Sequence, residues 1–475
     1  MKKLLCILLT MALLAGCAAP TVPTTEPQAG EVLIRLSDEG IEYPADSGIQ
    51  TAEEAEHTVV RITRPGTYRV TGSITAGQLA VDLGENAKDD PDATVLLILD
   101  NAEITCRTAP AVIFYNVWES GVANGLAGAH VLLANGSKNR IVGACTEDYD
   151  GAFYSRMSMK LDGTGSLRIE GGNEGLCSEL HLTIDGGDIS ISSGNDGINT
   201  NADGVSVTTI NDGRLWIAAG GDEGDGIDSN GSVVINGGYI EAYACADSMD
   251  SGIDADLGIR INGGTVIATG NMLDPIDEGG QTFAVFSFAQ QQKAPWFTLK
   301  DMYASTVLEG QTPSAFTNLL FSSPELSEGT YTLWAGDTQF EGVTQVGGSG
   351  FGLIGGEPIE RPDFPGKGEG GDVEIPPQPT MPIVTHGTIQ PPPEGDRPAD
   401  MPAPQLPEGA ENMPVPPEPP EGAENMPVPQ LPEGVEPPQD GFGRQPVQVV
   451  TGSLSTDFAL VKGANYFTNV RAVTE

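Results

Sequence analysis

Positive charge is scarce in this sequence. The 475 residues contain 23 Lys and Arg against 66 Asp and Glu, which gives a formal net charge of −43 at pH 7. Proteins that bind nucleic acid present a basic surface to the phosphates, so this balance excludes nucleic acid as a partner. A chain this acidic attracts cations instead.

Cysteine is also rare. Two of the six cysteines lie within the first 17 residues, and the others are dispersed along the chain. Dispersed cysteines cannot form the disulfide framework of a large core, so we interpret them mainly as small buried hydrophobic residues, with a disulfide as the alternative. These residues are Cys106, Cys145, Cys177 and Cys245.

Long apolar runs are absent after the N-terminus. Lys2 and Lys3 precede an apolar run from Leu4 to Leu14, which is the layout of a secretory signal and is too short to span a bilayer. The motif LAGC, which ends at Cys17, resembles the bacterial lipobox. We therefore predict an exported protein that is anchored to the extracellular side of the cell membrane only by lipid on Cys17. An ordinary cleaved signal is the alternative.

The composition divides the chain into segments. Residues 1–16 form the predicted signal peptide, 17–30 a lipidated tether, and 31–355 a region of short strands broken by Asn, Asp and Gly. Residues 356–444 are rich in Pro, Glu and Gly, repeat PEGAENMPVP at 407–416 and 420–429, and are predicted to be disordered. Residues 445–475 again resemble strands, which we expect to pack on the preceding fold.

A repeat of about 25 residues organises the strand region. It appears as LTIDGGDISI at 182–191, TTINDGRLWI at 208–217, VVINGGYIEA at 233–242 and IRINGGTVIA at 259–268. Short strands and Gly turns at this period predict an all-β solenoid, a right-handed single-stranded parallel β-helix. The alternation of a strand places one set of side chains inside and its neighbours outside. The inward set is Ile189, Leu215, Ile240 and Val266, and the outward set is Asp188, Arg214, Tyr239 and Thr265.

Acidic residues recur in the second turn of each repeat. Between residues 171 and 280 there are 19 Asp and Glu but only two Arg. In register, the turns give two columns. The first contains Glu174, Asp196, Asp225, Ser251 and Asp274, and the second contains Asn199, Asp228, Asp254 and Asp277.

Stacked carboxylates repel, so the columns need a counter-charge. Calcium is favoured because it accepts six to eight oxygen ligands in irregular geometry, whereas magnesium demands a stricter octahedron and zinc prefers His or Cys. A solvated acidic edge is the alternative, and Asn236 and Asn262 are interpreted as a structural ladder. The predicted metal ligands are Asp225, Asp228, Asp254, Asp274 and Asp277, supported by Asp196, Asn199, Asp250 and Asp256.

The segments RPGTYRVTGSITAGQLAV, TVLLILDNAEITCRTAPAV and LDGTGSLRIEGG, together with the DGI and INGG turns, resemble the clostridial-type carbohydrate-binding β-helix family. The resemblance covers about Thr63 to Gly355. It implies a pectate-lyase-like fold, calcium in the repeats, and binding of polygalacturonate and cellulose. Two departures, Ser251 in place of an acid and Pro275 in place of Gly, affect the outermost metal positions.

Binding without catalysis is the favoured function, in a monomer. Calcium can bridge the acidic protein to uronate carboxylates. Candidate sugar-contacting residues are Arg214, Trp216, Tyr239 and Tyr243, although hydrophobic cover by a loop explains the aromatic residues equally well. A calcium-dependent lyase is the runner-up, but it needs a base near the metal, and the acidic region offers only Arg214 and Arg260. An adhesin or scaffold is a third possibility.

Overall fold

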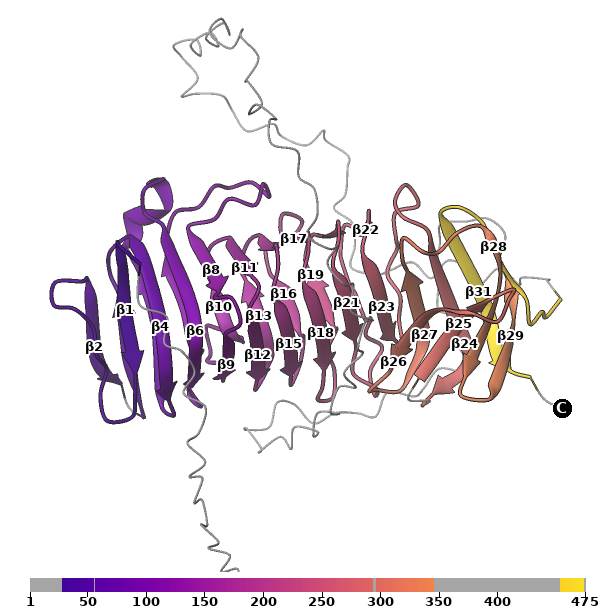
Figure 1. Cartoon of the computed structure of the whole chain (residues 1–475), viewed down its shortest axis with the longest axis horizontal. Coiled ribbons are helices and arrows are strands. Elements are labelled where there is room, and N and C mark those ends of the chain that lie inside the picture. Colours follow the sequence, from indigo (N-terminus) through magenta and orange to yellow (C-terminus); the bar gives the residue numbers. More distant parts are fainter. Residues whose placement is uncertain (1–27, 55, 294–295, 346–452, 474–475) are drawn as a thin grey trace, which may run out of the picture. The chain divides into compact units, whose positions relative to one another are not determined.

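The computed structural model describes residues 28–54, 56–293, 296–345 and 453–473 (Figure 1). These residues form β-strands and one short 3₁₀ helix, η1 (Glu85–Asp89), which confirms the all-β prediction. No helix within them is long and apolar enough to cross a membrane. The predicted signal peptide, Cys17 and the Pro-rich segment 356–444 lie outside the described residues.

One of the two large sheets has eight strands. Its strands pair in parallel except for the first two, which form an antiparallel hairpin. In chain order they are β2 (Ile49–Glu54), β3 (His57–Ile62), β5 (Gly77–Asp82), β7 (Val112–Asn116), β10 (Gly151–Ser155), β13 (Glu174–Ser178), β16 (Ile198–Thr200) and β19 (Ile227–Ser229).

The second sheet has 23 strands, and those as far as residue 270 pair in parallel with one another. We call these strands and the parallel strands of the eight-stranded sheet the parallel ladder. Figure 1 shows its members stacked side by side. The members from the second sheet are β1 (Glu31–Leu36), β4 (Gly66–Ile74), β6 (Val95–Thr105), β8 (Ala129–Leu133), β9 (Lys138–Gly143), β11 (Met159–Gly163), β12 (Ser166–Gly171), β14 (Leu182–Ile184), β15 (Asp188–Ser193), β17 (Val207–Ile210), β18 (Arg214–Ala219), β20 (Ser232–Ile235), β21 (Tyr239–Tyr243), β22 (Ile259–Ile261) and β23 (Thr265–Gly270).

The predicted register of the repeats is confirmed. Ile189 pairs with Leu215, Leu215 with Ile240, and Ile240 with Val266. All four side chains are fully buried. Parallel strands lie about 4.8 Å apart, so identical positions of successive repeats stack directly and form a continuous aliphatic core.

The remaining eight strands form what we call the C-terminal sheet, in which most pairings are antiparallel. The sheet as a whole is therefore mixed, and the prediction of one parallel solenoid over residues 31–355 is wrong from Phe283 onward. The repeat stops before this point, so no stacked position remains to continue the ladder. The strands are β24 (Phe283–Gln292), β25 (Trp296–Asp301), β26 (Thr306–Gln311), β27 (Phe316–Ser322), β28 (Gly329–Ala335), β29 (Thr338–Thr344), β30 (Phe458–Leu460) and β31 (Ala464–Ala472).

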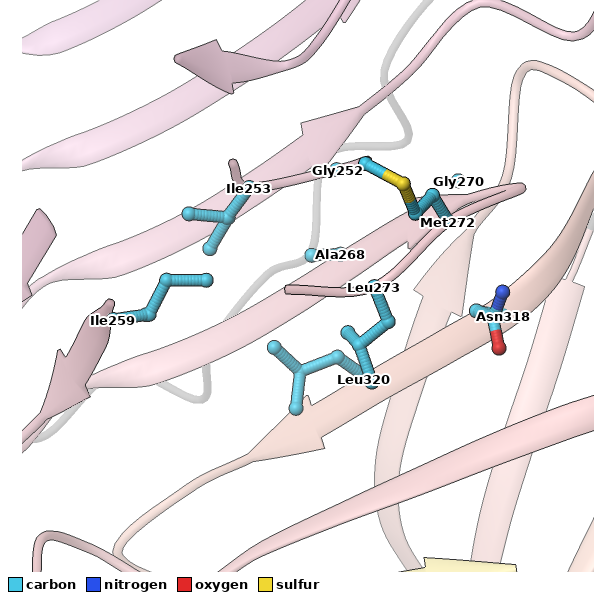
Figure 2. Close-up of a pocket in the computed structure, with 9 residues that line it drawn as sticks. All are labelled: Gly252, Ile253, Ile259, Ala268, Gly270, Met272, Leu273, Asn318 and Leu320. Carbon is cyan, nitrogen blue, oxygen red and sulfur yellow. The ribbon is translucent and has the colours of Figure 1, made fainter. Parts of the chain in front are cut away.

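The two regions meet where β27 pairs antiparallel with β23, the last parallel strand. Figure 2 shows Ile253, Ile259, Leu273 and Leu320 around a small apolar cavity at this junction. Its volume is about 10 Å³, which is at the limit for a single water molecule. The aliphatic core therefore ends at this junction, and the cavity is too small for a ligand.

The Asn residues of the INGG turns form the predicted structural ladder. Asn262 Nδ2 donates to Asn236 Oδ1 at 2.8 Å, and Asn236 Nδ2 donates to Asn211 Oδ1 at 2.7 Å. The second glycine of these turns has positive φ, +84° at Gly238 and +83° at Gly264, a conformation that side chains with a Cβ rarely adopt.

The four described cysteines are free. Cys106, Cys177 and Cys245 are buried, as the interpretation as small hydrophobic residues requires. Cys145 is exposed, so that interpretation is wrong for this residue.

Candidate functional site

The acidic turns lie beside the eight-stranded sheet, and its register fixes their side chains. Cys177 pairs with Asn199, and Asn199 pairs with Asp228. A parallel bridge between Ile227 and Ile253 places Asp254 next to Asp228 in the following repeat. Because the isoleucines face the core, these polar side chains project from the outer face of the sheet.

Three carboxylates converge at the end of this column. Asp225, Asp228 and Asp254 each offer one oxygen, and the three oxygens lie within 4.8 Å of one another. Asp225 and Asp228 belong to one repeat and Asp254 to the next. Asp225 is held in place because its Oδ1 accepts the backbone N–H of Ser251 at 2.5 Å. We call these three residues the acidic triad.

The preceding repeat extends the acidic triad through hydrogen bonds. Asp196 Oδ1 accepts the N–H of Asp225 at 2.8 Å. Asn199 Nδ2 donates to Glu174 Oε1 at 2.9 Å and to Asp196 Oδ2 at 3.3 Å. The other amide atom, Asn199 Oδ1, is buried and has no hydrogen-bond partner among the described residues. A buried oxygen without a donor is costly, so this position favours a cation or a water molecule.

Burial and mutual repulsion raise the pKa values of these acids. Desolvation is the main cause, and neighbouring carboxylates add to it. No described Lys or Arg forms an ion pair with any of them. The pKa rises to about 6 at Asp196, about 7 at Glu174 and Asp228, about 8 at Asp225 and about 9 at Asp254.

The other predicted acids lie at different distances from the acidic triad. Asp274 is beside Asp254, whose pKa it helps to raise, and its Oδ2 accepts the N–H of Ala255 at 2.9 Å. Asp256 is exposed but close enough to raise the pKa of Asp228. Asp250 also helps to raise the pKa of Asp225, and its Oδ2 accepts the N–H of Gly224 at 2.6 Å and the hydroxyl of Ser248, which stabilises the turn.

Asp277 does not continue the column, so the register predicted for this residue is wrong. Ile276 forms a bridge with Ile259 of β22 rather than with Ile253. Asp277 therefore lies beside Arg260 and not beside Asp254. There its carboxylate forms an exposed ion pair with Arg260 at 3.2 Å. The turn motif LDPIDE resembles the earlier turns in sequence, but the chain that follows β23 does not complete another repeat.

The aromatic candidates are less exposed than predicted. Tyr243 is fully buried, donates its hydroxyl to Glu241 at 3.1 Å and contacts Trp216 edge-to-face at 6.2 Å between ring centroids. Tyr239 packs against the core of the C-terminal sheet. The predicted exposure of Tyr243 is therefore wrong.

Two candidates from the same face still reach the surface. Trp216 is half-buried, and Arg214 is exposed with its guanidinium 5.4 Å from the ring centroid of Tyr239. Both belong to β18. The chain continues from β18 through the turn that carries Asp225, so this outer face of β18 belongs to the same repeat as Asp225 and Asp228.

Sequence reasoning left two contributors out of the predicted site. Glu174 accepts from Asn199 and from the Cys177 thiol at 2.5 Å, and it carries a raised pKa. The position of Glu174 in the first column of turn residues was the sequence signal that could have identified it. Ser251 lacks a carboxylate, but its backbone N–H orients Asp225, a role that side-chain identity alone could not reveal.

A family described as "Carbohydrate-binding domain-containing protein" matches residues 56–282. That range contains the acidic triad and ends before the C-terminal sheet. A relative with the same description, from Acetivibrio thermocellus, is 28% identical over 196 residues. The alignment covers 39% of this chain and 62% of the relative, so the chain spans less than two thirds of that protein.

A solved structure titled "Structure of the polysaccharide lyase-like protein from C. thermocellum, Gadolinium derivative" is also similar. It is 25% identical, with a TM-score of 0.39, and the match covers 50% of this chain and 93% of that chain.

Proposed function

We propose that this protein binds polysaccharide, and that calcium links the turns of a right-handed parallel β-helix formed by the parallel ladder. The family description that matches residues 56–282, and the same description of the relative, support carbohydrate binding. The acidic triad supports the metal, because three carboxylate oxygens within 4.8 Å of one another have no described cationic partner. This convergence is the observation that carries the proposal.

Calcium fits the donors better than other common ions. The acidic triad offers only oxygen atoms, and calcium accepts carboxylates, amide oxygens and backbone carbonyls together. Asn199 Oδ1, which is buried and has no partner in the described part of the chain, adds an oxygen ligand from the preceding repeat. Zinc would favour His or Cys. In the ladder, the Cys177 thiol already donates to Glu174, and its pKa is raised well above its usual value by burial.

The metal acts between repeats. Asp225 and Asp228 come from one repeat and Asp254 from the next, so one ion bound to all three joins neighbouring turns. Binding displaces the protons that burial and repulsion keep on these groups. Calcium therefore removes the repulsion that stacking creates.

We place the glycan surface on the outer face of β18, which pairs with β15 and β21 on its two sides. Trp216 offers a half-buried ring for stacking on a sugar, and Arg214 offers a guanidinium that can pair with a uronate carboxylate. An acidic polymer such as polygalacturonate meets this face, and calcium at the neighbouring turn offsets the charge of the protein. Export and lipid anchoring at Cys17 would place the surface outside the cell.

Catalysis is not part of this proposal. A lyase needs a basic group free to abstract a proton near the metal. Arg260 is paired with Asp277, and Arg214 is taken up by the uronate carboxylate with which it pairs. Incubation with polygalacturonate and calcium should therefore release no unsaturated product, whose absorbance is easily followed.

Retention on immobilised polygalacturonate tests the proposal. The parent chain should be retained in calcium and released by a chelator, and D228N/D254N should be retained weakly in both. D277N is the matched control, since it removes an acid of the same region that lies outside the acidic triad. Retention of the parent that is unaffected by chelator would contradict the role of calcium. Trp216→Ala should weaken retention without changing calcium binding measured by calorimetry.

A further inference from the structure

We propose that the outer face of the C-terminal sheet is a second glycan-binding surface, which takes a neutral polysaccharide without calcium. The surface is carried by Trp296 and Trp334, and we call it the tryptophan face. It lies outside the residues that match the carbohydrate-binding family. It goes beyond the calcium-dependent function proposed above and does not rest on it.

The register of four strands assembles the tryptophan face. Trp296 of β25 pairs with Gln311 of β26, and Trp334 of β28 pairs with Thr298 on one side and Gln339 on the other. Since Thr298 lies opposite Trp334, Trp296 is its diagonal neighbour, about 7–8 Å away between Cα atoms. The face consists of Trp296, Thr298, Lys300, Thr306, Glu309, Gln311, Thr332, Trp334 and Gln339.

Both tryptophans lie on the outer side of their strands. Their neighbours Phe297 and Leu333 point inward and are fully buried in the aromatic core. Trp296 is 39% exposed, and Trp334 is half-buried. Two of the four tryptophans of the chain therefore occupy an outer face, where they contribute little to the core and present large rings to solvent.

Local contacts fix the ring of Trp334 before any ligand arrives. Its Nε1 donates to Thr332 Oγ1 at 2.9 Å, and the Lys300 ammonium lies 4.7 Å from the ring centroid. A fixed ring loses little entropy when a ligand stacks on it. The cation–π contact also stabilises the ring position by about 0.5–1 kcal/mol at an exposed site, which favours a prepared platform over a mobile side chain.

The residues around the rings favour a sugar over a protein. A protein interface surrounds its aromatic anchors with a closely packed apolar core. Here the rings are surrounded by threonine hydroxyls and glutamine amides, which donate and accept the hydrogen bonds that sugar hydroxyls need. The apolar C–H faces of a β-linked sugar ring complement the indole faces. The face thus combines stacking and hydrogen bonding in the arrangement that a pyranose chain requires.

Charge on the tryptophan face favours a neutral polymer. It contains one Lys and one Glu, so its formal charge is zero, and the Lys300 ammonium already contacts Trp334. An acidic glycan would find no net positive charge and no bound calcium there. The tryptophan face and the acidic triad therefore differ in the ligand charge that they accept and in their need for metal.

Retention of the full chain on insoluble cellulose and migration in gels containing xylan or β-glucan test the proposal. The parent chain should bind at least one of these neutral polymers in the presence of chelator. Trp296→Ala and Trp334→Ala should each weaken binding by about tenfold, and the double variant should lose it. Tyr303→Ala is the matched control, because Tyr303 is 80% exposed but lies in the turn between β25 and β26, beyond the tryptophan face.

Retention of the double variant on polygalacturonate separates this proposal from the preceding one. The double variant should keep its calcium-dependent binding, whereas Trp216→Ala should keep its binding to the neutral polymer. No binding of the parent to any of the neutral polymers would overturn the tryptophan face. Unchanged binding by a double variant with the melting temperature of the parent would overturn it as well, as would capture of a protein in place of a glycan.

Discussion

The parallel ladder and the C-terminal sheet stabilise their cores in different ways. In the ladder, aliphatic side chains stack on their equivalents from neighbouring repeats, so each contact is short in sequence and repeated. In the C-terminal sheet, aromatic rings from strands far apart in the chain form one cluster that includes Phe286, Phe297, Phe458 and Phe467. A repeat distributes stability along the chain, whereas a cluster concentrates it.

The largest expected effect follows from this concentration. Phe286 stacks on Phe467 at 5.2 Å and contacts Phe458 edge-to-face at 5.1 Å, which joins β24 to strands more than 170 residues later. Phe286→Ala should cost about 3–5 kcal/mol of unfolding free energy. Hydrogen exchange should show lost protection throughout β24, β30 and β31.

Leu215→Ala sharpens the comparison because it removes a fully buried side chain from the ladder. It should cost about 2–5 kcal/mol, but increased exchange should be confined to β15, β18 and β21, which pair around it. Loss of protection over the whole ladder after Leu215→Ala would contradict the local character of ladder stability.

Calcium should stabilise the ladder and leave the C-terminal sheet unchanged. At a concentration of about 100 times the dissociation constant, the ion should add about 2.7 kcal/mol. Asp254→Asn should abolish this gain while leaving the metal-free protein at least as stable, because a neutral amide replaces a buried carboxyl whose charged form burial, Asp274 and Asp225 disfavour. Denaturation with calcium and with chelator measures both quantities. A calcium gain that persists in Asp254→Asn would place the ion elsewhere.

The free energy of unfolding of the metal-free protein should fall as the pH rises. Carboxylates in ion pairs usually have the opposite effect. The pKa values of Asp196, Asp225 and Asp254 are raised to about 6, 8 and 9 from an ordinary value of 3.8. Between about pH 4 and pH 9 the folded state therefore holds more protons than the unfolded state, so its stability falls as the pH rises.

Denaturation in chelator at pH 5, 7 and 9 measures this fall. Calcium affinity should increase over the same range, because binding displaces the protons. Asp254→Asn should show a smaller fall than the parent chain. Stability that rises with pH in chelator would mean that an unrecognised positive charge neutralises the acidic triad.

The same contrast explains what the sequence could predict. The all-β class and the inward set from Ile189 to Val266 followed from the repeat, because stacked positions must share one parity. The acidic triad could be approached in the same way, since Asp228 and Asp254 occupy equivalent positions. The C-terminal sheet has no repeat, and its pairings depend on tertiary packing that local pattern does not encode.

The main errors in the sequence-based predictions lie near the boundary between the parallel ladder and the C-terminal sheet. Tyr243 alternates as an outer residue but is buried, and Tyr239 packs against the C-terminal cluster. The alternation of side chains along a strand assigns each side chain to one face of that strand. It does not indicate which other strands cover that face. The tryptophans of β25 and β28 went unnoticed for the same reason, since no period linked them.

Asp277 provides the smallest expected effect and tests the end of the ladder. Its ion pair with Arg260 joins two half-exposed side chains, and exposed pairs contribute about 0–1 kcal/mol. Asp277→Asn should therefore change the unfolding free energy by less than about 1 kcal/mol and leave calcium affinity unchanged. A calorimetric titration that showed weaker calcium binding by Asp277→Asn would bring this residue back into the column and extend the ladder by one repeat. An unchanged titration would fix the last metal-binding turn at Asp254, where the register observed between Ile227 and Ile253 ends.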